Sequence, residues 1–198
     1  MVDIVAVDAG RVEEAAATLA RAMLDEPLGR WLLPDPVEFL EVHERLFART
    51  MVRAIEEGRL DACGDPFVGV AVWFERPAIE EDSQPPTSDM APLVPEHASA
   101  RVDEVSRQLR LMRRQARPDH HVYLDGIGVL PDHRRRGYAT GLLAAGFEWA
   151  DSLALPCSLE TLDPDNVAFY RHLGFEVVAA EALEGSGLTV TSMRRPPP

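Results

Sequence analysis

The stretch Arg134-Arg135-Arg136-Gly137-Tyr138-Ala139-Thr140 decides the fold of this chain. An apolar run over residues 122–130 leads into it, and a segment with helical spacing over 141–151 follows it. A glycine-centred turn between a strand and a helix directs several backbone N–H groups at one point, where the helix dipole adds partial positive charge. The consecutive arginines add mobile positive charge. The stretch therefore predicts an anion site that suits the pyrophosphate of a cofactor.

Motifs that are missing narrow the class of cofactor. The stretch lacks the Gly-Lys-Ser/Thr ending of a nucleotide triphosphate loop, which argues against ATP hydrolysis. The start of the chain lacks three glycines at dinucleotide-fold spacing, which argues against NAD. The feature of the loop that carries its resemblance to a known cofactor loop is the order Arg-x-x-Gly-x-Ala, at Arg134, Gly137 and Ala139. Taken alone, the same loop is also compatible with an arginine-rich surface turn that caps a helix.

A second informative block lies downstream of the loop. It reads Leu159-Glu160-Thr161-Leu162-Asp163-Pro164-Asp165-Asn166-Val167-Ala168-Phe169-Tyr170-Arg171-His172-Leu173-Gly174-Phe175-Glu176. Together, the loop and this block resemble the two signatures of the GCN5-related N-acetyltransferase (GNAT) superfamily, whose acetyl-CoA pyrophosphate loop reads Gln/Arg-x-x-Gly-x-Gly/Ala. Residues 121–130 resemble the strand that enters this loop. Within the superfamily the chain resembles the puromycin N-acetyltransferase-like branch, a looser likeness carried by residues 22–27, 30–35, 159–175 and 193–196.

The expected fold class is α/β (α+β). Hairpin, crossover and closing strands indicate a mixed sheet with helices on both faces. The resemblance implies the GNAT fold, a central mixed twisted sheet of six to seven strands in which two parallel central strands splay apart and the pantetheine of acetyl-CoA enters the gap. The segments expected as strands are 2–7, 59–63, 67–74, 121–130, 157–162, 175–179 and 188–193, and those expected as helices are 12–23, 37–57, 101–115, 141–151 and 167–172.

The bulk properties restrict the class of protein. At 198 residues, with 46% apolar and 27% charged residues, we expect a single soluble GNAT domain over 1–198. We expect no membrane partner and a cytoplasmic location, because no long apolar stretch and no basic signal-peptide start is present. The net charge of −13 argues against a nucleic-acid partner, and is compatible with a cationic substrate or with surface charge that keeps the protein soluble. We expect no metal site, and a monomer or a homodimer.

The resemblance implies which residues hold acetyl-CoA. The backbone of the loop would hold the pyrophosphate, with Arg134 and Arg136 as charge partners. Main-chain groups of the preceding strand would pair with the pantetheine amides, and an N–H near Val129 would polarise the thioester carbonyl. The residues expected to bind the cofactor are Ile127, Gly128, Val129, Leu130, Arg134, Arg135, Arg136, Gly137, Tyr138, Ala139, Thr140, Asn166 and Tyr170.

Tyr170 is the candidate acid. A tyrosyl O–H can protonate a thiolate of similar basicity without large tuning, and the resemblance places Tyr170 where many members supply this proton. The alternative is a core tyrosine beside Phe169. Asn166 is expected to hydrogen-bond the pantetheine or to cap the helix that bears Tyr170.

The general base stays open at this stage. Several GNAT members use a glutamate where this chain has Tyr123. Strand alternation puts Asp125 and His121 on the same face as Tyr123, and Glu160 lies on the neighbouring strand. Asp125 and Glu160 are the candidate catalytic carboxylates, with a surface position and a salt bridge as their structural alternatives. Proton loss through ordered water is a further route.

These observations predict an acetyl-CoA-dependent N-acetyltransferase that acts on a small-molecule amine by direct transfer in a ternary complex. A Pro-rich loop at 75–96 and a helix at 101–115 are expected to act as a lid over a compact ligand. One alternative is acetylation of a protein or peptide N-terminus, which would need an open groove. Another is a non-catalytic acyl-CoA-binding or ligand-binding module. An acetyl-cysteine at Cys157 is disfavoured, because a lone buried cysteine is usually inert.

Overall fold

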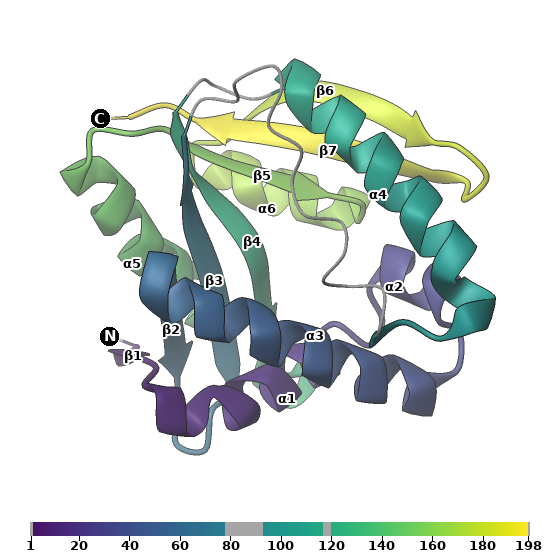
Figure 1. The fold of residues 1–198 in the computed structure, drawn as a ribbon. Helices are drawn as coiled ribbons and strands as arrows, with labels where there is room; N and C mark the ends of the chain where they lie inside the picture. The colour runs from purple at the N-terminus through teal and green to yellow at the C-terminus, as the bar shows by residue number, and fades with distance from the viewer. Residues whose placement is uncertain (1, 78–92, 117–119, 198) are drawn as a thin grey trace.

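The centre of the molecule is a mixed sheet of seven strands in the order β1-β2-β3-β4-β5-β7-β6 (Figure 1). The computed structural model describes residues 2–77, 93–116 and 120–197. Among the described strands, β4 and β5 form the parallel pair and the other neighbours are antiparallel. The strands are β1 Ile4–Ala6, β2 Gly58–Cys63, β3 Gly69–Arg76, β4 His121–Val129, β5 Cys157–Thr161, β6 Glu176–Leu183 and β7 Leu188–Arg195.

The parallel pair separates soon after it forms. β4 and β5 are in register at Val122 with Cys157 and at Tyr123 with Ser158, yet β4 runs on to Val129. A bulge marks the same region, because Trp73 of β3 pairs with Leu124 and the preceding Val72 pairs with Gly126, so that Asp125 is the extra residue on β4. The sheet therefore opens between its two central strands, as the resemblance implied.

Helices cover both faces of this sheet. Helices α1 and α3 pack on one face and α5 packs on the other (Figure 1). The alternation of β3 divides the core accordingly, since Val72 and Phe74 join the α1–α3 side whereas Trp73 joins the α5 side. The helices are α1 Val12–Ala22, α2 Pro27–Leu32, α3 Pro36–Glu57, α4 Glu96–Ala116, α5 Tyr138–Ser152 and α6 Pro164–His172. Among the described residues, no helix is both long enough and apolar enough to cross a membrane.

Close packing brings α5 down onto β3. Gly146 of α5 is where the two elements meet, and a Cβ atom built there would collide with the indole ring of Trp73. Trp73 is fully buried and also meets Phe147 edge-on, with the ring centroids 6.1 Å apart. The small residue lets the helix sit directly on the sheet, and this contact holds the first turn of α5 at the open end of β4.

Several elements begin elsewhere than the sequence predicted. Prolines cause part of the difference. Pro27 stands in the first turn of α2, a helix that the sequence analysis did not expect, and Pro164 in the first turn of α6, which was expected only from residue 167; at both positions the missing N–H is not needed. Helix α5 begins at Tyr138 and not at residue 141. Of the Pro-rich loop expected over 75–96, residues 75–76 belong to β3 and residue 96 begins α4. Residues 78–92 lie outside the described part of the chain.

Candidate functional site

The loop after β4 ends in a glycine that starts a helix. Gly137 has φ +83° and is the N-cap of α5. The first intrahelical hydrogen bond of α5 runs from the N–H of Gly141 to the carbonyl of Gly137, at 2.9 Å. The N–H groups of Tyr138, Ala139 and Thr140 therefore precede the hydrogen-bond ladder and lie at the positive end of the helix dipole. This arrangement is suited to a phosphate group.

A second residue of the loop shares this unusual backbone. Arg135 has φ +61°, a value that a non-glycine residue rarely adopts. A Cβ atom at Gly137 would meet no atom within 4 Å, so it is the backbone angle, and not crowding within the protein, that requires glycine there. The left-handed turns at Arg135 and Gly137 together bend the chain sharply from the strand into α5.

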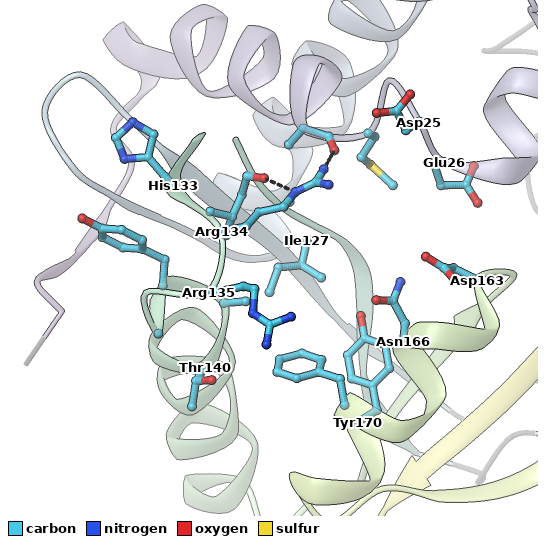
Figure 2. Close-up of a pocket in the computed structure, with 18 of the residues that line it drawn as sticks. Asp25, Glu26, Ile127, His133, Arg134, Arg135, Thr140, Asp163, Asn166 and Tyr170 are labelled. Atoms are coloured by element: carbon cyan, nitrogen blue, oxygen red, sulfur yellow. Dashed lines mark hydrogen bonds between the residues drawn. The ribbon is translucent and has the colours of Figure 1, made fainter. Parts of the chain in front are cut away.

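The loop forms one wall of a pocket of about 700 Å³. Figure 2 shows the guanidinium of Arg135 pointing into it, with Asn166 and Tyr170 of α6 across from the loop. The connection between α1 and α2 forms a further wall. The expected cofactor residues that line the pocket are Ile127, Gly128, Val129, Arg134, Arg135, Gly137, Tyr138, Ala139, Thr140, Asn166 and Tyr170.

Two of the expected cofactor residues do not line this pocket. Leu130 lies at the end of β4, where its N–H donates to the carbonyl of Val68 at 2.9 Å. Arg136 is exposed and is absent from the lining. The two arginines expected as charge partners of a pyrophosphate thus differ, since Arg134 borders the pocket and Arg136 faces solvent.

The side chain of Arg134 braces the loop. Its Nε donates to the carbonyl of Val129 at 3.2 Å, and its Nη2 donates to the carbonyl of Ala22 at 2.9 Å (Figure 2). These bonds join the end of β4 to the end of α1. The positive charge of Arg134 remains beside the pocket, and two of its five N–H donors hold the walls together.

Tyr170 lies under the pocket with its hydroxyl pointing into the cavity (Figure 2). Its ring packs against Phe169 and Phe175, with centroid separations of 5.4 and 5.8 Å, and the residue is only 7% exposed. Burial raises the pKa of Tyr170 to about 12, and the nearby charge of Asp163 acts in the same direction. The phenol is therefore protonated at neutral pH and can donate a proton.

The cap of α6 is Asp163. Its carboxylate accepts a hydrogen bond from the N–H of Asp165 at 3.0 Å. The prediction that Asn166 caps this helix is therefore wrong, because the residue before the proline at the helix start occupies the cap position. Asn166 instead lines the pocket, one helical turn before Tyr170, so the other predicted role, a hydrogen bond to pantetheine, stays a prediction.

The sequence analysis missed three carboxylates that line the pocket, Asp25, Glu26 and Asp163. Glu26 is the cap of α2, and its Oε2 accepts a hydrogen bond from the N–H of Gly29 at 2.7 Å. Burial raises the pKa of Glu26 and the carboxylate of Asp163 adds to this, whereas the N–H groups of Gly29 and Leu28 act in the opposite direction. An acidic residue directly before Pro27 is the sequence signal for this cap.

Glu160 is part of a separate polar network. Its Oε2 accepts hydrogen bonds from Tyr123 Oη at 2.6 Å and from Arg113 Nε at 2.7 Å, and Arg113 Nη2 lies 2.9 Å from Tyr123 Oη. The Glu160 side chain is 8% exposed, and burial raises the pKa of Tyr123 well above its ordinary value. The network ties α4 to β4 and β5. Glu160 thus has the structural role that was its alternative, a salt bridge.

Asp125 also lies away from the pocket lining. It is the bulged residue of β4, and its Oδ1 lies 3.8 Å from Arg76 Nη2. Burial raises its pKa, against the charges of Arg76 and Arg113. After the bulge Gly126 and Gly128 face α1, which ends the regular alternation on which the prediction rested. Neither Asp125 nor Glu160 lines the same pocket as Tyr170.

Two other side chains considered from the sequence are enclosed. Cys157 is fully buried in the core on the α5 side, and burial raises the pKa of its thiol to about 11. A thiol with this pKa is mostly protonated at neutral pH and is a poor nucleophile. His121 is also fully buried, so that neither side chain can reach an acceptor in the pocket without rearrangement.

Comparisons with known proteins bear on the family and the fold of this chain. The model of the Acetyltransferase (GNAT) family matches residues 103–175. A Corynebacterium glutamicum protein described as histone acetyltransferase HPA2 and related acetyltransferase has a TM-score of 0.71 at 19% identity, over 100% of this chain and 98% of that one. Drosophila melanogaster polyamine N-acetyltransferase has a TM-score of 0.73 at 14% identity, over 98% and 99% of the chains.

A third similar structure is arylalkylamine N-acetyltransferase 2 of Aedes aegypti, with a TM-score of 0.70 at 11% identity over 98% of each chain. At these identities the likeness is one of fold. The narrower likeness to the puromycin N-acetyltransferase-like branch stays a prediction.

Proposed function

The chain carries a GNAT acetyltransferase domain, and we propose that it transfers the acetyl group of acetyl-CoA to the amine of a small molecule by direct attack in a ternary complex. The observation that carries the proposal is that a single pocket has two sides with different chemistry. The N-terminus of α5 and Arg135 line one side of it, and a protonated tyrosine with nearby carboxylates lines the other. Acetyl transfer to an amine requires a binding site for the pyrophosphate of the cofactor and groups that can accept and donate protons.

The loop residues fit a pyrophosphate. Gly137 has no side chain to block the approach of a phosphate, and its φ of +83° turns the first N–H groups of α5 toward the pocket. We assign the pyrophosphate to the N–H groups of Tyr138, Ala139 and Thr140, with Arg135 as the charged side chain. When bound, acetyl-CoA supplies the activated acetyl group.

On the acidic side of the pocket we assign proton transfers to two residues. Glu26 accepts a proton from the acceptor ammonium, since its carboxylate lies in the lining and has a raised pKa. The neutral amine nitrogen then bonds to the carbonyl carbon while the carbon–sulfur bond breaks, and the nitrogen loses its second proton, which replaces the proton that Tyr170 gives up. Tyr170 donates its proton to the departing thiolate. These assignments replace Asp125 and Glu160 as candidate bases, because neither of those carboxylates lines the pocket.

The predicted lid stays a proposal. The described part of α4 contributes no residue to the pocket lining and packs instead against α2 and β6. The one-domain organisation over 1–198, the cytoplasmic location and the monomeric or homodimeric state are likewise predictions of the sequence.

The direct test is steady-state release of CoA with a panel of small amines, set beside peptides with free N-termini. Turnover of small amines and not of peptides supports the proposal. The reverse preference would favour an N-terminal acetyltransferase. Tight acetyl-CoA binding with no CoA release from any amine or peptide would indicate a binding module.

A further inference from the structure

The pocket has opposite charge at its two sides. Arg134 and Arg135 lie on the loop side, and Glu26 and Asp163 lie on the other, beside Asn166 and Tyr170 (Figure 2). The basic side suits phosphates. The acidic side cannot share this role, because phosphate and carboxylate repel each other, and its charge suits a cationic ligand instead.

Glu26 and Asp163 come from different helices and lie close enough to interact. Each caps the start of its helix with a hydrogen bond to a backbone N–H, and the negative charge of Asp163 is one of the causes that raise the pKa of Glu26. In the described part of the chain, no Arg or His nitrogen lies within 4.0 Å of either carboxylate, whereas neighbouring Asp25 has Arg30 at 3.4 Å. Two adjacent carboxylates thus line a pocket without a compensating cation from the protein.

An independent feature points to a ligand at the same place. Tyr170 is 7% exposed, and among the described residues its hydroxyl has no hydrogen-bond partner, although its ring is packed on two sides. The hydroxyl points into the pocket on the side of Asn166 and Asp163 (Figure 2). The hydroxyl opens onto the pocket, so a polar group of a bound ligand can pair with it there.

We propose that the acceptor carries two cationic groups, of which the reacting ammonium lies at Glu26 and the second is held by Asp163. The inference rests on the proposed function and narrows its substrate class to diamines and aminoalkyl guanidines. The reason is the number of charges left in the pocket once the acceptor amine is deprotonated. The reacting ammonium gives its proton to Glu26, which becomes neutral, while the amine that attacks is neutral too. Asp163 then still lacks a counter-charge, and a second cationic group on the same molecule supplies it.

The test compares two acceptors that share a chain length and a reacting group, 1,4-diaminobutane and n-butylamine. The wild-type protein is expected to give the higher kcat/KM with the diamine. Asp163→Asn removes the charge but keeps a good helix cap, since Asn and Asp cap equally well. Losing one charged interaction should lower the diamine-to-monoamine ratio of kcat/KM by about 10- to 100-fold. Asp163→Ser, with a different capping side chain, should do the same.

The matched control is Asp165→Asn. Asp165 lies in the first turn of the same helix and carries the same charge, but it is exposed and does not line the pocket. This variant should keep the wild-type ratio. Calorimetry adds a readout apart from turnover: with CoA present, 1,4-diaminobutane should bind the wild-type and Asp165→Asn proteins more tightly than the Asp163→Asn protein.

Two results would overturn the inference and leave the proposed function standing. One is equal kcat/KM for the two acceptors in the wild-type protein. The other is an unchanged ratio and unchanged diamine affinity in both Asp163 variants, with thermal melts that show them folded. An absence of CoA release with every amine is a different result, because it would overturn the proposed function as well.

Discussion

The guanidinium of Arg134 donates a hydrogen bond to the carbonyl of Ala22, 2.9 Å away across 112 residues of sequence. Ala22 is the last residue of α1, and Arg134 follows the short turn after β4. A second bond from the same side chain reaches Val129 at 3.2 Å. One arginine of the loop thereby holds the end of α1 and the end of β4 as neighbouring walls of the pocket. The α1–α2 connection carries Glu26, so this link also helps to place the acidic side of the site.

Replacing Arg134 with Met should loosen this link. The arginine is exposed, so we expect the free energy of unfolding to fall by only about 1 kcal/mol, less than the roughly 1.5–3 kcal/mol typical of hydrogen bonds of charged groups. If the binding free energy of acetyl-CoA falls by a similar amount, about 1 kcal/mol, the Kd of acetyl-CoA should rise about five- to tenfold. Urea denaturation and calorimetry measure the two effects. Arg136→Met removes the same charge from an exposed neighbour, and an equal effect there would contradict the bracing role.

Gly137→Val tests the phosphate loop. The glycine φ of +83° is strained for a β-branched residue, and a side chain at this point would stand where a phosphate must approach. We expect loss of acetyl-CoA binding by calorimetry, with the fold retained, because a Cβ atom there meets no protein atom within 4 Å. Gly185→Val is the control, since Gly185 has φ +81° and equal free space but does not line the pocket. Near-normal affinity in Gly137→Val would refute the assignment.

Tyr170→Phe tests the acid. The ring packing stays and the hydroxyl is lost, so kcat should fall by about 10²- to 10⁴-fold while acetyl-CoA affinity stays close to that of the wild-type protein. Thermal stability should change little, because among the described residues the hydroxyl has no hydrogen-bond partner to lose. Steady-state kinetics and a thermal melt give the two readouts. Turnover at the wild-type rate would leave Tyr170 as a core tyrosine.

Glu26→Gln and Glu160→Gln separate the base from the structural carboxylate. In the Glu26 variant the amide oxygen of the introduced glutamine can still accept the bond from Gly29 N–H, so this protein should fold and lose about 10²- to 10⁴-fold in kcat/KM. Glu160→Gln should instead lower stability by about 1–3 kcal/mol, because it disturbs the bonds from Tyr123 and Arg113. Steady-state kinetics and urea denaturation of both variants measure the two effects. The opposite pattern would return the role of base to Glu160.

The pH dependence of the wild-type enzyme follows from the same assignment. A base must be ionised to accept a proton, and the pKa of Glu26 is raised above its usual 4.5. The lower limb of the kcat/KM profile should therefore lie above pH 4.5 and disappear in Glu26→Gln. The contribution of Glu26 to stability depends on pH in the opposite direction to that of a salt-bridged carboxylate. Ionisation of Glu26 is harder in the folded state, so its contribution to stability declines as pH rises from its unfolded pKa through its folded pKa.

Local patterns were enough for much of the fold. The loop around Gly137 was predictable because a strand, a glycine turn and a helix follow one another without interruption, and Tyr170 because its block is equally continuous. Helix starts were harder. No helix was expected at Pro27, and α6 was expected only from residue 167, although an acidic cap directly before each proline begins a helix there. The bulge at Asp125 was also invisible, since it depends on the register between β3 and β4.

By itself, the sequence determined the glycine-centred turn that starts α5 and the tyrosine across the pocket from it, since backbone angles and helix starts are decided by neighbouring residues. Only the tertiary structure decided that Asp25 and Glu26, far from Tyr170 in sequence, share a pocket with that tyrosine. Asp125 and Glu160 lie on the central strands, yet the bulge and the pairing with Arg113 and Arg76 engage them outside the lining. Glu26, distant in sequence, reaches the pocket because α1 packs against β4 and the next turn continues over its open end. Such long-range placement follows from how helices pack on the sheet, which no local pattern encodes.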